Sequence, residues 1–140
     1  MILNVDDLGF QYGDTPVLEQ VNFSVQQGEI TVILGPNGVG KTTLLKCLNR
    51  ILNPDQGDIQ IENSSIKKMG IREIARKVSY VAQSSQPNRM TVFDSVLMGR
   101  LPNMGCRTKP EDLKKTDAVI RMMNLSRLKL KTLDQLSGGE

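Results

Sequence analysis

Residues 35–42 read Gly35-Pro36-Asn37-Gly38-Val39-Gly40-Lys41-Thr42 and fit the pattern G-x-x-x-x-G-K-[ST] at every position. An apolar run at 30–34 comes directly before the pattern, and apolar residues at helical spacing follow it at 44–52. The pattern therefore lies between a predicted strand, buried on both faces, and a predicted helix. This order of strand, glycine-rich loop and helix predicts an α/β fold built around a phosphate-binding loop.

The residue types of this loop suit the chemistry of a triphosphate. Phosphate oxygens carry concentrated negative charge, and glycines let backbone N–H groups point at them without obstruction. The start of the following helix adds unpaired N–H groups and the positive end of its dipole. We expect Lys41 to reach the β- and γ-phosphates, Thr42 to place its hydroxyl on Mg²⁺, and Thr43 to contact the α-phosphate. The alternative, a glycine-rich turn that happens to precede a helix, leaves the lysine and the threonine unexplained.

The first part of the chain alternates strands and helices. Alternating or continuous apolar residues predict strands at 2–10, 21–25, 59–61 and 78–81, and short helices are predicted at 44–52 and 71–77. Beyond Gln83 the pattern changes to helices joined by polar loops. We therefore divide the chain into a phosphate-binding core at 1–83, a helical subdomain at 84–135 and a last segment at 136–140.

Two helices are predicted in the helical subdomain. Thr91, followed three positions later by Asp94, has the spacing of a helix start. Pro110 suits the first turn of a second helix, which is expected to end near Asn124. Its predicted apolar stripe consists of Leu113, Ile120 and Met123.

Composition excludes several classes of protein. With 39% hydrophobic and 24% charged residues the sequence is that of a soluble globular domain. Its apolar runs are too short to span a bilayer, and Asp6 and Asp7 interrupt the only apolar start, so a signal peptide is not expected. We expect a cytoplasmic chain whose two cysteines, Cys47 and Cys106, are reduced thiols.

Two further features of composition limit the chemistry. The chain has no histidine, which removes imidazole metal ligands and histidine bases from these positions. The net charge of +3 is spread along the chain, so nucleic acid is not an expected partner.

Three more features narrow the ligand. Tyr12 offers an aromatic face upstream of the loop, although a single tyrosine is also typical of a core or a surface. Gln83 follows the predicted strand at 78–81, at the edge of a parallel sheet where ligands gather, although alone it is an ordinary loop glutamine. The third feature is the segment Leu136-Ser137-Gly138-Gly139-Glu140.

The order of these features resembles the ATP-binding subunits of ABC transporters. In that family an A-loop aromatic, a Walker A loop, a Q-loop glutamine and an L-S-G-G-[QE] signature occur in this order, matching Tyr12, 35–42, Gln83 and 136–140. The resemblance covers essentially the whole chain. It implies ATP and Mg²⁺ as cofactors, with Tyr12 and 35–43 binding the nucleotide and Thr42 and Gln83 near the metal.

The resemblance also implies partners. In the family two ATPase subunits enclose two ATP molecules, so Ser137, Gly138 and Gly139 would contact the γ-phosphate held by a second subunit, alongside the catalytic roles of Lys41 and Gln83. Transmembrane permease subunits would dock on the segment at 84–105, unless that segment is an ordinary exposed loop. The family then places the chain at the inner face of the membrane, with a solute-binding protein as an indirect partner.

The segment at 91–102 and the glutamate form of the signature are similar to ATPases that power uptake of iron-siderophores, haem and cobalamin. Two departures from the family pattern, Ala82 in place of a frequent proline and Val39 in place of a smaller residue, remove no ligand group. The resemblance puts the Walker B aspartate, the catalytic glutamate and the switch histidine beyond Glu140. We therefore expect these 140 residues to be a truncated chain that binds nucleotide weakly and hydrolyses it negligibly.

Two other functions stay open. A non-transport ABC ATPase acting on nucleic acid or ribosomes would carry the same motifs. The absence of sustained heptads disfavours a chromosome-type member, in which long coiled coils separate the loop from the signature. The second alternative is a regulator that binds nucleotide and never hydrolyses it.

Overall fold

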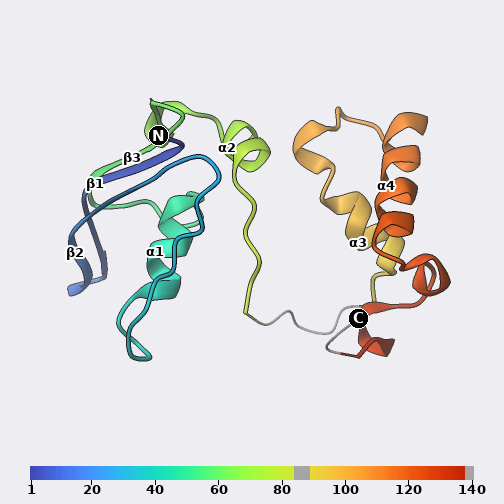
Figure 1. The fold of residues 1–140 in the computed structure, drawn as a ribbon, viewed down its shortest axis with the longest axis horizontal. Coiled ribbons are helices and arrows are strands. Elements are labelled where there is room, and N and C mark those ends of the chain that lie inside the picture. The colour runs from blue at the N-terminus through green and yellow to red at the C-terminus, as the bar shows by residue number, and fades with distance from the viewer. Residues whose placement is uncertain (84–88, 138–140) are drawn as a thin grey trace. The chain divides into compact units, whose positions relative to one another are not determined.

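The computed structural model describes residues 1–83 and 89–137, in two compact units, Met1–Tyr80 and Val81–Glu140 (Figure 1). The predictions for Gly138, Gly139 and 84–88 concern residues outside the described ranges. Across the described ranges, each helix is too short or too polar to cross a lipid bilayer.

An antiparallel sheet forms the base of the first unit. Its strands are β1 (Leu3–Tyr12), β2 (Thr15–Val25), β3 (Gln56–Ile61) and β4 (Ser64–Ser65), in the order β2-β1-β3-β4. β1 pairs with β2 on one side and with β3 on the other. The β3 ladder begins at Gln56, opposite Gly9, so the last residues of β1 run on beyond it. Those last residues carry Tyr12 toward the end of the β1–β2 hairpin.

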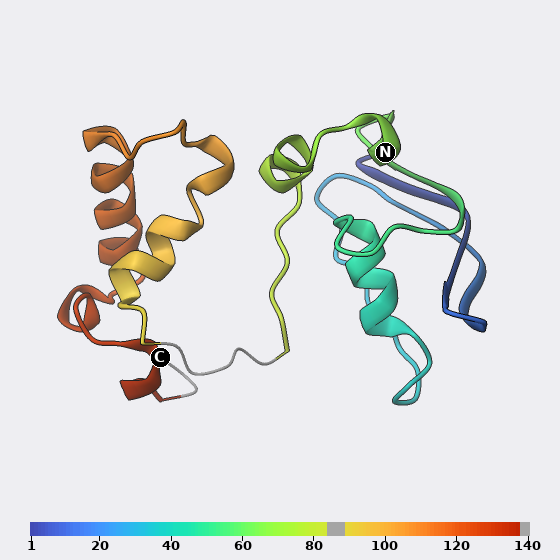
Figure 2. The same ribbon diagram turned by 180° about the vertical axis from the view of Figure 1, so that it is seen from behind.

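Two helices and a turn of 3-10 helix complete this unit: α1 (Lys41–Leu48), η1 (Ile66–Lys68) and α2 (Ile71–Lys77). α1 lies against the sheet, as Figures 1 and 2 show from opposite sides. The apolar core consists of Val5, Leu8, Phe10, Leu18, Leu44, Cys47, Ile59, Ile61, Ile66, Met69 and Ile74. Burying an aliphatic side chain contributes roughly 1.5–3 kcal/mol. The core therefore anchors α1, and with it the loop that precedes α1.

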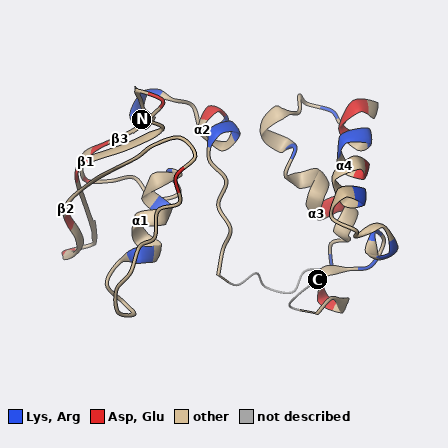
Figure 3. Cartoon of the chain, viewed as in Figure 1, with Lys and Arg blue, Asp and Glu red and all other residues tan. Residues whose placement is uncertain are grey.

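The second unit is helical. It contains α3 (Val92–Met98) and α4 (Pro110–Met122), with the 3-10 turns η2 (Leu101–Asn103), η3 (Ser126–Leu128) and η4 (Leu133–Gln135). The Thr91 hydroxyl accepts a hydrogen bond from the Asp94 N–H at 3.1 Å, so the predicted helix start is confirmed. On α4 the ion pairs Glu111–Lys115 and Asp117–Arg121 join residues one turn apart, where acidic and basic segments alternate (Figure 3).

The predicted strands at 30–34 and 78–81 are wrong for this structure. Neither segment belongs to a strand, and Ile30, Leu34 and Val81 are 93, 86 and 91% exposed. All ladder pairs between the named strands are antiparallel, so the partly parallel sheet that we expected is not present among the described residues. A strand requires a neighbour for its N–H and C=O groups, and none of the described strands pairs with these runs.

Two helix predictions also need correction. α1 ends at Leu48, with Arg50 in the left-handed region at φ 57°, so the helix does not continue to residue 52. On α4 the buried residues are Asp112, Thr116 and Ile120, whereas Leu113 and Met123 are exposed. Asp112 is buried with the Arg100 guanidinium and the Lys109 N–H as its partners, whereas the buried Thr116 hydroxyl has no hydrogen-bond partner among the described residues.

Candidate functional site

The glycine-rich loop reaches α1 through a glycine in the left-handed region. Gly40 is the N-cap of α1 with φ 98°, and its carbonyl accepts the Leu44 N–H at 2.8 Å. A Cβ at Gly40 would come within 3.0 Å of the Val17 side chain and 3.1 Å of the Leu18 side chain. Both the backbone conformation and this close approach to β2 therefore require glycine at position 40.

The N-terminus of α1 is open to an anion. No side chain among the described residues caps it, and its first turn holds no acidic residue. The first N–H groups of a helix have no partner within the helix, and they lie at the positive end of its dipole. Such an end favours a bound phosphate.

The Lys41 side chain turns back over the loop. Its Nζ donates to the carbonyl oxygens of Gly35 at 2.8 Å and Pro36 at 2.6 Å. The ammonium group is therefore held beside the loop, where it adds a positive charge to the open helix end. Thr42, the next residue, is exposed, whereas Thr43 is only 8% exposed and faces the core.

The aromatic residue upstream of the loop lies next to the turn of the β1–β2 hairpin. Tyr12 pairs with Thr15, and Phe10 pairs with Leu18, whose side chain lies against Gly40. The Tyr12 side chain is 51% exposed, so one part of its ring is free to contact a ligand. The structure thus places the β1–β2 hairpin, which carries Tyr12, against the glycine-rich loop at Gly40.

Gln83 and Ser137 belong to the second unit, where both are exposed. The roles of these residues beside the loop stay predictions. Of the docking segment at 84–105, the described part comprises α3, η2 and the adjoining turns.

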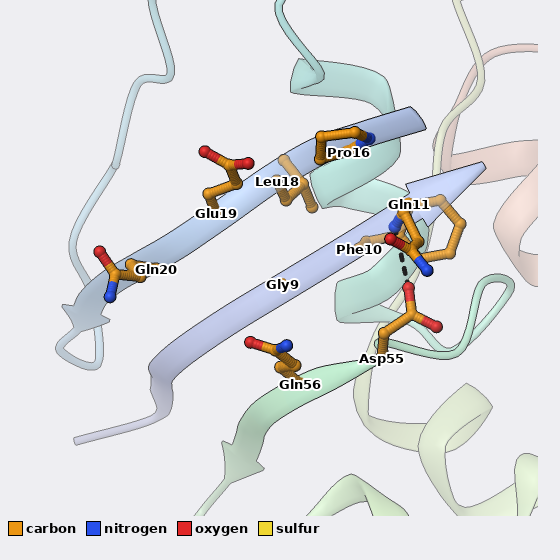
Figure 4. A pocket seen from close by; sticks show the side chains of 9 residues that line it. All are labelled: Gly9, Phe10, Gln11, Pro16, Leu18, Glu19, Gln20, Asp55 and Gln56. Atoms are coloured by element: carbon orange, nitrogen blue, oxygen red, sulfur yellow. Dashed lines mark hydrogen bonds between the residues drawn. The ribbon is translucent and has the colours of Figure 1, made fainter. Parts of the chain in front are cut away.

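Sequence reasoning missed one contact near Tyr12. Asp55 Oδ2 accepts the Gln11 N–H at 2.8 Å, and the Asp55 N–H donates to the Gly9 carbonyl at 2.9 Å. Asp55 also lines a hollow of about 360 Å³ on the sheet, together with Gln11 and Gln56 (Figure 4). The sequence signal was weak, since an aspartate directly after a proline, with a glycine two residues later, is typical of any turn.

The thiol of Cys47, on α1, is the group in this unit whose pKa departs most from its usual value. Burial raises the pKa of Cys47 to about 11, and the negative charge of Asp55 contributes in the same direction. A thiol in this state is neutral and unreactive at physiological pH, so Cys47 serves as a core residue.

Comparisons with known proteins agree with the motif order. The sequence profile described as ABC transporter matches residues 18–140. An uncharacterized ABC transporter ATP-binding protein of Methanocaldococcus jannaschii is 45% identical over 140 residues, which is all of this chain and 55% of that protein. The petrobactin import ATP-binding protein YclP of Bacillus subtilis is 38% identical over 99% of this chain and 56% of its own length. The chain thus spans about half the length of these relatives.

Solved structures show the same fold. A nucleotide-free ATP-binding cassette from an ABC transporter superposes with a TM-score of 0.83 at 26% identity, over 99% of this chain and 60% of that one. An inward-facing, putative metal-chelate type ABC transporter superposes with a TM-score of 0.73 at 31% identity, over 99% of this chain and 50% of that one. The fold is therefore that of a P-loop α/β cassette with a helical subdomain. With the family profile matching most of its length, the chain belongs to the ABC transporter family.

Proposed function

We propose that the protein is the ATP-binding subunit of an ABC importer and couples ATP binding and hydrolysis to uptake of a metal chelate, such as an iron-siderophore or cobalamin. The observation that carries ATP binding is the open N-terminus of α1 with the Lys41 ammonium beside it. Tyr12, at the same end of the hairpin, supplies an aromatic face for the adenine.

Mg²⁺ fits the residues around the loop. This cation takes oxygen ligands, keeps several waters and is usually held through the phosphates of its substrate. Thr42 offers an exposed hydroxyl one residue after Lys41. Gln83, which belongs to the second unit, is the further ligand that the family resemblance implies. The described residues contain no group of three acidic or cysteine side chains that would bind a metal without the nucleotide. Mg²⁺ would neutralise phosphate charge, while Lys41 and the helix end orient the triphosphate.

The expected partners follow from the same proposal. Two ATPase subunits would enclose the nucleotides, with Ser137, Gly138 and Gly139 of one subunit facing the loop of the other. Transmembrane permease subunits would hold the protein at the inner face of the membrane, and a solute-binding protein would deliver the chelate. Relatives named for petrobactin import and for iron(3+)-hydroxamate import, at 38 and 31% identity, support a chelate as the cargo.

Calorimetric titration with Mg-ATP tests the site. We expect Lys41→Ala to weaken binding about 10- to 100-fold, because a hydrogen-bonded charge on the phosphates is lost. Lys46→Ala is the matched control, since Lys46 lies in the last turn of the same helix, away from the loop. Equal affinities of wild type and Lys41→Ala would overturn the site.

Hydrolysis is expected only from the full-length protein. We propose that the 140 residues alone bind nucleotide and turn it over negligibly, since the family's water-activating glutamate is not among them. Steady ATP turnover by the purified 140-residue chain, abolished by Lys41→Ala, would contradict this.

The cargo is tested in cells. Deleting the gene should abolish growth on a ferric siderophore as sole iron source, and the wild-type copy, but not Lys41→Ala, should restore it. Neighbouring reading frames for a permease and a solute-binding protein would support import. Their absence, with normal chelate uptake by the deletion strain, would favour the non-transport ABC ATPase.

A further inference from the structure

At the end of β1 a side-chain hydrogen bond takes the place of the backbone hydrogen bonds of the sheet. The β3 ladder starts at Gln56, opposite Gly9, so the N–H of Gln11 lies beyond the strand that would have paired with it. Asp55 fills this place, because its Oδ2 accepts the Gln11 N–H at 2.8 Å. Its own N–H donates to the Gly9 carbonyl at 2.9 Å. Figure 4 shows this carboxylate in the hollow beside Gln11.

The ring of Tyr12, the residue after Gln11, is held by a second contact. Its centroid lies 4.9 Å from that of Phe10, with the two planes at 85°. This edge-to-face arrangement is a favoured geometry for aromatic pairs. Phe10 is itself 9% exposed and belongs to the apolar core, so it offers a rigid support to the half-exposed Tyr12 ring.

We propose that Asp55 and Phe10 are positioning residues for the nucleotide base: Asp55 fixes the backbone before Tyr12, and Phe10 fixes its ring, so that Tyr12 stacks on the adenine at little cost in entropy. This inference rests on the proposed function, since it assumes that ATP binds with its base at Tyr12. A side chain that is already ordered before binding loses less conformational freedom when the ligand arrives.

Because Asp55 and Phe10 lie beside Tyr12, substituting them should change binding of the adenine and not binding of the phosphates. Phosphate contacts would come from the loop and from Lys41, whereas Asp55 contacts the Gln11 N–H and Phe10 contacts the Tyr12 ring. A loss of positioning at Tyr12 should therefore weaken binding of ATP and leave binding of a bare triphosphate unchanged. A general loss of folding would weaken both.

The experiment measures dissociation constants of the full-length protein for Mg-ATP and for Mg-bound inorganic triphosphate. Their ratio gives the contribution of the nucleoside, for which stacking predicts about 5- to 150-fold in the wild type. We expect Asp55→Ala and Phe10→Leu each to lower the ratio by about threefold to tenfold, with triphosphate affinity changed by less than about twofold. Asp55→Asn, which keeps an acceptor oxygen for Gln11, should retain the ratio.

Gln56→Ala is the matched control, because Gln56 lines the same hollow and the substitution leaves the Asp55–Gln11 bond in place. An unchanged ratio in both Asp55→Ala and Phe10→Leu would overturn the inference, as would an equal loss of both ligands. If Asp55→Ala does not fold, Phe10→Leu and Asp55→Asn decide the question.

The wild type distinguishes this inference from the proposed function. Binding of triphosphate with no preference for ATP would overturn the stacking role of Tyr12 and with it the inference, while the phosphate site would stand. Binding of neither ligand would overturn the proposed function itself.

Discussion

The Nζ of Lys41 donates to the carbonyl oxygen of Pro36 at 2.6 Å, so the cation of the loop is held by the loop's own backbone. A second bond, from the same Nζ to the Gly35 carbonyl oxygen at 2.8 Å, holds the side chain at the first residues of the loop. A bound triphosphate would compete with these carbonyls for the ammonium. Binding would therefore exchange internal bonds of the loop for bonds to phosphate, and the loop without nucleotide depends on Lys41 for its order.

Lys41→Met should loosen the loop in the absence of nucleotide. Each lost hydrogen bond to a charged group removes about 1.5–3 kcal/mol at most, and less where water replaces it. We expect faster amide hydrogen exchange at residues 35–40, measured by mass spectrometry. Lys46→Met, on the same helix, should leave exchange in the loop unchanged. Identical exchange in wild type and Lys41→Met would show that the two carbonyl bonds do not order the loop.

Gly57→Ala should destabilise the first unit. Gly57 has φ 75°, and a Cβ there would overlap the backbone carbonyl oxygens of Asp6 and Asp7. The left-handed conformation alone costs an alanine about 1–2 kcal/mol, and the overlap adds to it. Urea denaturation should show a loss of at least about 2 kcal/mol in the free energy of unfolding.

Gly70→Ala is the comparison for Gly57→Ala. A Cβ at Gly70 meets open space, and its φ of −70° suits any residue. Because Gly70 is the N-cap of α2, where alanine is a poorer residue, a loss of at most about 1 kcal/mol is expected. Equal losses in the two variants would contradict the close approach of β1 to Gly57.

Asp112 should make the helical unit sensitive to acid. The backbone N–H of Lys109 and then the guanidinium of Arg100 hold the pKa of this buried carboxylate below its usual range. The pKa of Asp112 in the folded protein therefore lies below its unfolded value of about 3.9. Its carboxylate stabilises the folded protein above this unfolded pKa, and the stabilisation is lost as the pH falls through the folded pKa.

Asp112→Asn tests this dependence. At pH 7 it should unfold more readily than the wild type, as followed by hydrogen exchange within α4, and the difference should shrink as the pH falls below about 4. Glu111→Gln is the control, because Glu111 is exposed and its ion pair with Lys115 is solvated. A difference between wild type and Asp112→Asn that does not depend on pH would rule out a charge effect.

The two cysteines should differ in reactivity. Cys106 is exposed, whereas Cys47 is buried with its pKa raised to about 11. At pH 7.5 a thiol reagent such as iodoacetamide should label Cys106 within minutes and Cys47 only after unfolding, because the thiolate is the reactive form. Mass spectrometry of the labelled peptides gives the result. Rapid labelling of Cys47 in the folded protein would contradict the burial of this face of α1.

Several elements could be predicted from residues that lie close together in the sequence. The helix at 71–77 was predicted with the boundaries that α2 has, and the cap at Thr91 was predicted from its spacing to Asp94. These features depend on residues that contact one another locally. Of the predicted stripe of α4, Ile120 is buried as expected, whereas Leu113 and Met123 are exposed. The buried Asp112 is paired with Arg100, which lies outside α4, so spacing along the helix does not predict its burial.

The apolar runs at 30–34 and 78–81 show the opposite limit. Their composition is typical of strands, yet neither forms one, because a strand forms only where another strand pairs with it. Residues 30–34 and Val81 lie exposed, whereas Val78 packs partly buried against the core. Composition indicates that a segment can be buried in a sheet, but it does not show whether another strand pairs with that segment.

The sequence by itself predicts phosphate binding, since the glycines of 35–42, the lysine and the helix start would act through neighbouring backbone groups, and their order with Tyr12 and the signature identified the family. Only the tertiary structure decided what surrounds Tyr12. The hairpin register brings it to the end of the sheet near Gly40, Phe10 supports its ring, and Asp55 holds the strand before it. Asp55 is 44 residues from Gln11, and a contact across that separation follows from the packing of β1 beside β3, which residue spacing does not encode.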